Sequence, residues 1–136
     1  MSPDLQEDFY TRYPDLFKQK DLLPEQTAMC WGICFNDGWK DILEDLCKKL
    51  NLIHTVTGIQ IQFNQIKEKF GTLRIHWLTD CQPQNPEHVL WTSIIGSVIH
   101  ATESDSSTIC ELCGSVGKLY MDRNQCLCEK HCGGSR

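Results

Sequence analysis

Several features are missing from this chain of 136 residues, and each absence excludes a class of protein. No run approaches the roughly 18 apolar residues that span a bilayer, since polar residues and a glycine interrupt the best candidate, VLWTSIIGSVI. The start of the sequence, MSPDLQEDF, has neither the basic nor the apolar part of a secretory signal. We therefore expect a protein of the reducing cytoplasm, with no membrane association.

The motifs of common enzyme classes are also missing. The sequence has no glycine-rich phosphate loop, no pair of histidines at helical spacing and no nucleophile elbow. It lacks the His-x-Glu that precedes the cysteine pair of zinc deaminases. A thiol enzyme could use Cys30 or Cys34 with a histidine, but nothing local in the sequence supports such a pair. We therefore expect a protein that is not an enzyme.

Positive charge is scarce as well. The chain has 13 Lys and Arg residues against 18 Asp and Glu residues, so its formal net charge is −5. Residues 1–50 alone carry −4, whereas residues 110–136 carry +1. A protein that binds duplex DNA needs a concentrated positive face, and this composition argues against one. The acidic N-terminal part instead suits a basic partner surface, although solvated charges on helices would give the same pattern.

Cysteine, by contrast, is frequent, and its odd number of nine excludes complete disulfide pairing. Two pairs near the C-terminus, Cys110-x2-Cys113 and Cys128-x2-His131, have the spacing of metal ligands. Two intervening residues let a tight turn aim both side chains at one ion. Three thiolates and one imidazole form the closed ligand set of a structural zinc site, so we predict bound Zn²⁺.

The remaining cysteines leave two alternatives open. Cys126 or Cys132 could replace one of the four ligands, but the C-x2-H spacing suits the first turn of a terminal helix, which favours His131. A second metal site could draw on Cys30, Cys34, Cys47 and Cys81. No pair among these four has knuckle spacing, and cysteine within an apolar helical stripe behaves as a small hydrophobe. We therefore interpret all four as buried thiols.

Hydrophobic periodicity predicts an α+β fold. Apolar residues at helical spacing predict two helical pieces within 4–20, a helix over 38–51 with Asn36 or Asp37 as its cap, and a helix over 86–102. Alternation of apolar and polar residues predicts strands at 59–63 and 73–77, joined by a turn near Phe70-Gly71-Thr72.

These elements predict a two-part organisation. We expect residues 1–105 to form a body of helices packed on an antiparallel β-hairpin, and residues 106–136 to form a zinc-ribbon or treble-clef-like module. One face of the hairpin would belong to the core. The other would gather the only basic patch outside the C-terminal part, although its facing depends on the strand register. That patch comprises Lys67, Lys69, Arg74 and His76.

Several strings in the same order resemble a widespread family of small bacteriophage and prophage proteins with a terminal zinc-ribbon-like module. These strings are RYPDLFKQKDL, MCWGICFNDGW, KEKFGTLRI and CELCG…LCEKH. The resemblance supports the four metal ligands, and it marks Asp37-Gly38-Trp39 and Phe70-Gly71 among the positions of the family pattern. The sequence departs from the pattern at Ala28, Thr72, Cys126 and Cys132.

The resemblance implies a phage-type accessory protein, and we expect it to bind and inhibit a host protein, such as a defence effector of the kind that anti-CRISPR proteins inhibit. The expected contact residues are Asp41, Glu44, Asp45, Lys67, Lys69 and Arg74. The alternative is a nucleic-acid-binding zinc module that regulates transcription or DNA processing. Its phosphate contacts would be Lys67, Lys69, Arg74, Lys118, Arg123 and Lys130. The sequence leaves the partner's identity and the oligomeric state open.

Overall fold

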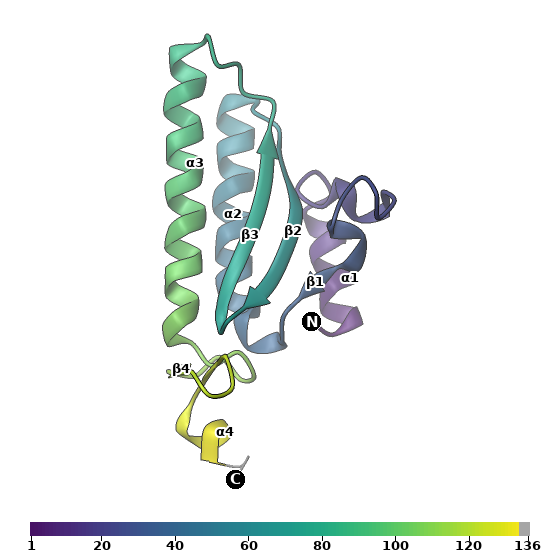
Figure 1. The fold of residues 1–136 in the computed structure, drawn as a ribbon. Helices are drawn as coiled ribbons and strands as arrows, with labels where there is room; N and C mark the ends of the chain where they lie inside the picture. The colour runs from purple at the N-terminus through teal and green to yellow at the C-terminus, as the bar shows by residue number, and fades with distance from the viewer. Residues whose placement is uncertain (134–136) are drawn as a thin grey trace.

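The computed structural model describes residues 1–133 of the chain. Within this range the chain forms three main helices, a three-stranded sheet and a separate two-stranded hairpin (Figure 1). In Figure 1, α2 lies behind the sheet, α3 runs beside β3, and α1 lies on the opposite side; the C-terminal module lies at the lower end of the molecule. This mixed architecture confirms the predicted α+β class.

The helices begin and end at residues with special backbone or side-chain properties. They are α1 (Pro3–Arg12), α2 (Lys40–Thr57), α3 (Pro86–Asp105) and α4 (Glu129–Gly133). The Asn85 side chain caps α3 by accepting hydrogen bonds from the N–H groups of Glu87 and His88. Gly58 follows the last residue of α2, and its φ of +76° lets its N–H bond to the His54 carbonyl in the last turn. In the described part of the chain, no helix has the length and apolar content needed to cross a membrane.

The first sheet has the strand order β1-β2-β3, with β1 at Ile33–Cys34, β2 at Ile61–Lys69 and β3 at Thr72–Thr79. β2 and β3 are antiparallel, and the pairing of Lys69 with Thr72 confirms the predicted turn at Phe70-Gly71. β1 runs parallel to β2 and was not predicted, because two residues are too few to show an alternating pattern.

The predicted cap of α2 is wrong. A 3-10 turn over Asp37–Trp39 precedes the helix, and neither Asn36 nor Asp37 caps it with its side chain. Asp37 Oδ1 instead accepts a hydrogen bond from the backbone N–H of Ser2 at 2.8 Å. Asn36 donates to the Glu111 carboxylate, 75 residues away in the sequence. Asn36 and Asp37 therefore form hydrogen bonds with residues distant in the sequence and do not cap the helix that follows them.

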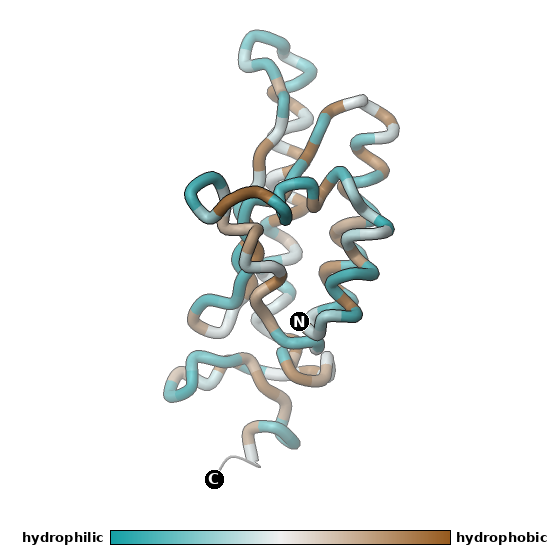
Figure 2. Tube along the Cα trace, turned by 90° about the vertical axis from the view of Figure 1, so that its right-hand side faces the viewer, coloured by the Kyte–Doolittle hydropathy of each residue, from teal (hydrophilic) through white to brown (hydrophobic). Residues whose placement is uncertain are grey.

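The core lies between α2 and the sheet, and the segment after α1 bonds to the part of β2 that the short β1 does not pair with, where the Phe63 N–H donates to the Leu16 carbonyl. Trp39, Leu43 and Leu73 are fully buried, and the rings of Phe17 and Phe63 pack at a tilt with their centroids 5.2 Å apart. Figure 2 shows brown hydrophobic positions within the helices and strands, and the loop at the top of the view is mostly teal. Burial of these apolar side chains is the main stabilising contribution to the body.

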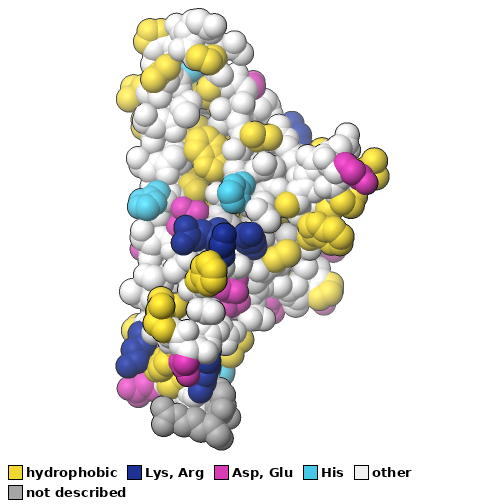
Figure 3. Space-filling view, in the orientation of Figure 1, with side chains coloured by type: hydrophobic (Ala, Val, Ile, Leu, Met, Phe, Trp, Pro, Cys, Tyr) yellow, Lys and Arg dark blue, Asp and Glu magenta, His cyan; other side chains and the backbone are white. Residues whose placement is uncertain are grey.

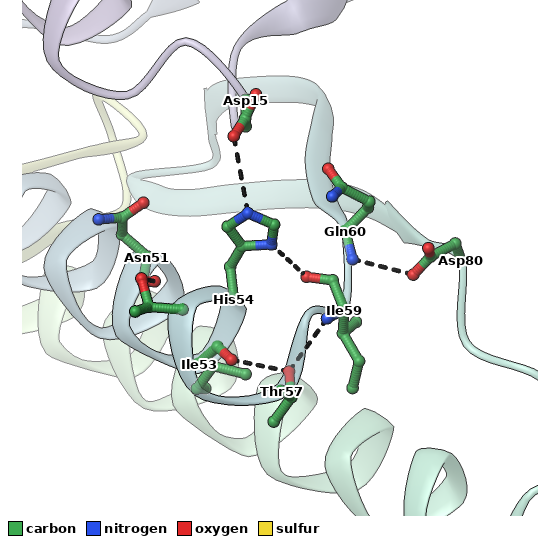
Figure 4. Close-up of polar contacts among 9 residues, drawn as sticks. Asp15, Asn51, Ile53, His54, Thr57, Ile59, Gln60 and Asp80 are labelled. Carbon is green, nitrogen blue, oxygen red and sulfur yellow. Dashed lines mark hydrogen bonds and ion pairs between the residues drawn. The ribbon is translucent and has the colours of Figure 1, made fainter.

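Polar contacts hold the turn between α2 and β2 (Figure 4). His54 Nδ1 bonds to the carbonyl of Ile59 at 2.8 Å, and its Nε2 faces Asp15 at 3.7 Å. The Gln60 N–H donates to Asp80 Oδ1 at 2.9 Å, which joins the start of β2 to the end of β3. These contacts join the α2–β2 turn to the end of β3 and to the segment after α1.

Candidate metal centre

A tight turn brings the first two cysteines of the predicted site together. The N–H of Gly114 bonds to the Cys110 carbonyl at 2.8 Å, and the N–H of Cys110 bonds to the Ser115 carbonyl at 2.7 Å. Gly114 has a φ of +82°, a conformation that side chains disfavour. The turn therefore places Cys110 and Cys113 on one side of the backbone, as the C-x2-C spacing predicts.

A short hairpin returns the chain to this turn. β4 (Lys118–Tyr120) pairs antiparallel with β5 (Gln125–Leu127), and Cys128 follows directly. α4 begins at the next residue, so His131 lies in its first turn, three positions after Cys128. The knuckle, hairpin and helix together have the order of a treble clef, which agrees with the module predicted from the sequence.

The four predicted ligands form one cluster. Their donor atoms all lie within 4.8 Å of one another. The Cys113 and Cys128 sulfurs are 3.7 Å apart, and His131 Nδ1 lies 3.5 Å from Cys110 Sγ and 3.2 Å from Cys128 Sγ. With zinc–sulfur bonds of about 2.3 Å, a regular tetrahedron separates two sulfurs by about 3.8 Å and a sulfur from a nitrogen by about 3.6 Å. The cluster therefore fits a metal ion such as zinc.

The surroundings of the cluster favour ionised sulfur. Hydrogen bonds from the hydroxyl and backbone N–H of Ser115 lower the pKa of the Cys113 thiol to about 6. A lower pKa favours the thiolate, which is the form that binds metal. Cys110 and Cys128 are buried and Cys113 is exposed, so the cluster lies at the surface of the module. Four protein ligands leave no open position, which is typical of structural zinc sites.

The two alternative ligands make other contacts. Cys126 is fully buried, belongs to the core of the body and donates to the Ser107 carbonyl at 3.3 Å. Cys132 Sγ donates to the Glu129 carbonyl at 3.3 Å. Neither belongs to the ligand cluster among residues 1–133. Both therefore remain outside the donor set that the C-x2-C and C-x2-H spacing predicts.

The interpretation of the four remaining cysteines as buried thiols needs correction. Cys47 is fully buried in α2, and burial raises the pKa of its thiol well above the usual value. Cys34 is exposed, however, and Cys30 and Cys81 are half-buried. No second group of three potential metal ligands occurs among the described residues. Cys34 is exposed because it lies in the edge strand β1, with its side chain turned away from the core.

The module is joined to the body by residues that precede α2. The indole N–H of Trp39 donates to the Ile109 carbonyl at 2.9 Å, and the Gly38 N–H donates to the Glu111 carbonyl at 2.7 Å. A Cβ at Gly38 would lie 2.3 Å from the Cys110 carbonyl oxygen. From the sequence, the Asn-Asp-Gly-Trp run is expected only to precede and cap a helix. In the structure it is the segment of the body that contacts the metal module.

A buried carboxylate completes this joint. Glu111 is only 3% exposed, and its Oε2 accepts hydrogen bonds from the backbone N–H and the side-chain amide of Asn36, both at 3.0 Å. Burial raises the pKa of the Glu111 carboxyl group. Sequence reasoning missed this residue because an acidic side chain between two metal ligands carries no periodic signal. The one feature of the sequence that could have drawn attention to Glu111 is its position within the C-x2-C turn.

The hairpin residues predicted to bind a partner lie together. Lys67 pairs directly with Arg74 across β2 and β3, and both line a shallow hollow with Lys69, Phe70 and His76. Figure 3 shows Lys and Arg side chains gathered at the centre of this face. Within the described part of the chain, no salt bridge joins these three cations to a carboxylate.

The acidic residues predicted on α2 differ in their availability. Glu44 accepts a hydrogen bond from the Tyr13 hydroxyl and forms a salt bridge with Arg12, each at 2.5 Å. Asp45 forms a salt bridge with Lys49 at 2.8 Å, whereas Asp41 is exposed. Two of the three carboxylates are therefore engaged within the protein.

The basic residues predicted in the module lie in different settings. Lys118 and Lys130 line a hollow of about 670 Å³ beside Tyr120, and Lys118 Nζ lies 5.4 Å from the Tyr120 ring centroid. Arg123 donates to the Cys132 carbonyl at 2.9 Å, which fixes it against α4. The cations of the β2–β3 hairpin and the lysines of the module therefore line two different hollows.

Comparison of the chain with protein-family models, with curated proteins and with solved structures finds no match. The chain is an α+β protein whose C-terminal Cys3His cluster is suited to a metal ion such as zinc.

Proposed function

We propose that the protein is a non-enzymatic accessory protein of the phage type, which binds a host protein in the host cytoplasm and inhibits it. The closed donor set supports this role, because three thiolates and an imidazole leave a bound zinc ion no open position for a substrate. The metal would stabilise the fold of the C-terminal module, and exposed surfaces of the protein would bind the host protein. The expected target is a defence effector that handles nucleic acid, the class that anti-CRISPR proteins inhibit.

The observation that carries the proposal is an excess of exposed carboxylates over exposed cations on α1 and the start of α2, referred to below as the acidic α1–α2 surface. Asp8 of α1 and Asp41 of α2 are exposed and line the same hollow, which Arg12 and Lys40 also line, and Asp8 pairs with Arg12 at 2.7 Å. Asp4 and Glu7 are also exposed on α1, and no salt bridge joins them to a described residue. Such a surface attracts a basic groove, including a groove that binds nucleic acid.

Partner capture with charge-reversed variants tests the proposal. We expect the tagged parent protein to retain one specific partner from host lysate, and Asp41→Lys to weaken that retention about tenfold or more. Asp122→Lys is the matched control, because it makes the same change in net charge on the exposed tip of the β4–β5 hairpin. Glu44 is unsuitable as a probe, since its substitution would remove the internal contacts to Arg12 and Tyr13.

Two results would contradict this function. One is the absence of any specific partner in the lysate at low ionic strength, where attraction between exposed charges is strongest. The other is equal retention of the partner by the parent, Asp41→Lys and Asp122→Lys. Raised salt should weaken the parent complex, because exposed charges are screened.

A further inference from the structure

The tip of the β2–β3 hairpin has an unusual residue in a demanding position. Phe70 and Gly71 form its two-residue turn, with φ values of +55° and +86°. Positive φ at both positions is the pattern of a type I′ turn, which strongly prefers Asn-Gly. A bulky residue at positive φ is a true outlier, and the side chain of Phe70 is also 62% exposed. The turn would form more readily with a different residue here.

The side chains around the tip carry a second unfavourable arrangement. Lys67 lies directly opposite Arg74, and like charges in that relation destabilise a sheet. Lys69 places its Nζ 5.7 Å from the Phe70 ring centroid, so the ring and the cations form one cluster. The carboxylate of Glu68 lies nearby in sequence, but it accepts a hydrogen bond from the Gly71 N–H at 2.8 Å. Nothing within residues 1–133 neutralises the three cations through a salt bridge.

Phenylalanine is not the residue that this turn favours, and the opposed cations do not favour the strand pairing. We propose that the hairpin tip binds single-stranded nucleic acid, with one base stacked on Phe70 and phosphates held by Lys67, Lys69 and Arg74. Aromatic rings within a positively charged surface are the general means of holding single strands, because every base has a face that can stack. This site is separate from the acidic α1–α2 surface, so it goes beyond the proposed function.

The surroundings favour a single strand over the other anionic macromolecules. A base can stack on Phe70 only when it is unstacked from its neighbours, which a duplex does not offer. The protein as a whole is acidic, with a net charge of −5, so it lacks the broad positive face that a duplex requires. Lysine is depleted at protein–protein interfaces, whereas two of the three cations here are lysines. Charge and shape therefore both favour a flexible phosphate chain with exposed bases.

Fluorescence anisotropy with labelled oligonucleotides tests the site on the zinc-loaded full chain. The probes are single strands of DNA and RNA of about 12 nucleotides, and a duplex of the same sequence. We expect the single strands to bind more tightly than the duplex. Three phosphate contacts predict that log K falls with log salt concentration with a slope of about −2. Lys69→Gln should reduce the magnitude of that slope by about 0.7.

Substitution of the ring separates binding from folding. Phe70→Asn should weaken binding roughly 5- to 150-fold, the range for one stacked base. It should leave the melting temperature unchanged or raise it, because asparagine is favoured at this turn position. Phe70→Tyr should keep most of the affinity, since it keeps the ring. Trp31→Asn and Lys48→Gln are the controls, because they change an exposed aromatic residue and an exposed cation elsewhere and should leave binding unchanged.

Four results would overturn the inference. The first is no binding of either single strand, or binding without a salt dependence. The second is duplex binding as tight as single-strand binding. The third is unchanged affinity in Phe70→Asn. The fourth is displacement of the oligonucleotide by poly-L-glutamate at equal charge concentration, which would assign the tip to an acidic protein surface instead.

Discussion

At the scale of single residues, Arg12, Tyr13 and Glu44 show how tertiary contacts change the role of a side chain. Helical periodicity places Glu44 on the polar side of α2, and the sequence therefore suggests a carboxylate available to a partner. In the fold, Glu44 accepts a hydrogen bond from Tyr13 and pairs with Arg12, whose guanidinium lies 5.2 Å from the Tyr13 ring centroid. The carboxylate therefore ties the end of α1 to α2.

This contact makes a prediction about stability at high pH. Burial and the hydrogen bond to Glu44 raise the pKa of Tyr13 to about 12, from an ordinary value of 10.0. A raised pKa means that the fold favours the neutral phenol, so this stabilisation is complete below pH 10 and is lost as the pH rises towards 12. We expect Tyr13→Phe to lower the free energy of unfolding by about 1–2 kcal/mol at pH 9.

Urea unfolding of both proteins across this pH range gives the measurement. The difference in unfolding free energy between the parent and Tyr13→Phe should shrink between pH 10 and pH 12. A difference that stays constant from pH 9 to pH 12 would show that ionisation of Tyr13 is not linked to folding.

At the scale of elements, the segment before α2 has a role that its local sequence does not indicate. Asn36 and Gly38 contact Glu111, and Trp39 contacts Ile109. These contacts hold the metal module against the body. The close approach of two backbones at Gly38 supplies a physical reason for glycine at this position.

Replacement of this glycine should weaken the joint. In Gly38→Ala the new Cβ would lie 2.3 Å from the Cys110 carbonyl oxygen and 2.4 Å from that of Glu111, and neither backbone group can move aside cheaply. We expect a loss of about 1–3 kcal/mol in the free energy of unfolding.

Gly96→Ala is the matched control for this measurement. Its Cβ would meet only Trp77 Cζ2 at 3.6 Å, within α3, so we expect the protein to be unchanged or stabilised by up to about 1 kcal/mol. Equal stability of the two variants in urea unfolding would show that the module does not depend on close packing at Gly38.

At the scale of the whole molecule, two cores are joined into one structure. The larger core fills the body, and the smaller one surrounds Cys110, Leu127 and Cys128 in the module. Cys126 belongs to the larger core although it lies between two residues of the module. The smaller core has only three buried residues, which provide little stability by themselves. A metal ion commonly supplies the additional stability in a module of this size.

Removal of one ligand should therefore unfold the module and leave the body folded. Cys113→Ser is the sharpest variant, because Cys113 is exposed and its replacement removes a ligand with little loss of packing. We expect zinc in the parent protein at one ion per cluster, loss of that zinc in Cys113→Ser, and loss of hydrogen-exchange protection in β4 and β5.

Cys132→Ser is the control, and it should keep both the zinc and the protection of β4 and β5. Parent protein purified without chelators that contains no zinc would contradict the metal assignment. Retention of a full zinc complement by Cys113→Ser would contradict the choice of ligands.

The sequence by itself determined the features that depend on local spacing. The α+β class, the turn at Phe70-Gly71 and the four-residue metal cluster follow from periodicity and from ligand spacing, because helices, hairpins and metal knuckles are built from residues close together in the chain. The two-residue strand β1 could not be predicted, because its pairing with β2 joins residues about 33 positions apart.

Only the tertiary structure decided the roles that depend on contacts between distant segments. It assigned Asn36 to the Glu111 carboxylate and Glu44 to Tyr13, and it left Cys34 exposed. It also placed Lys67 opposite Arg74 beside the strained Phe70, which turned a basic stretch of sequence into one surface. The physical reason is that hydrogen bonds, burial and charge depend on distance in space, and folding brings together residues that the sequence keeps apart.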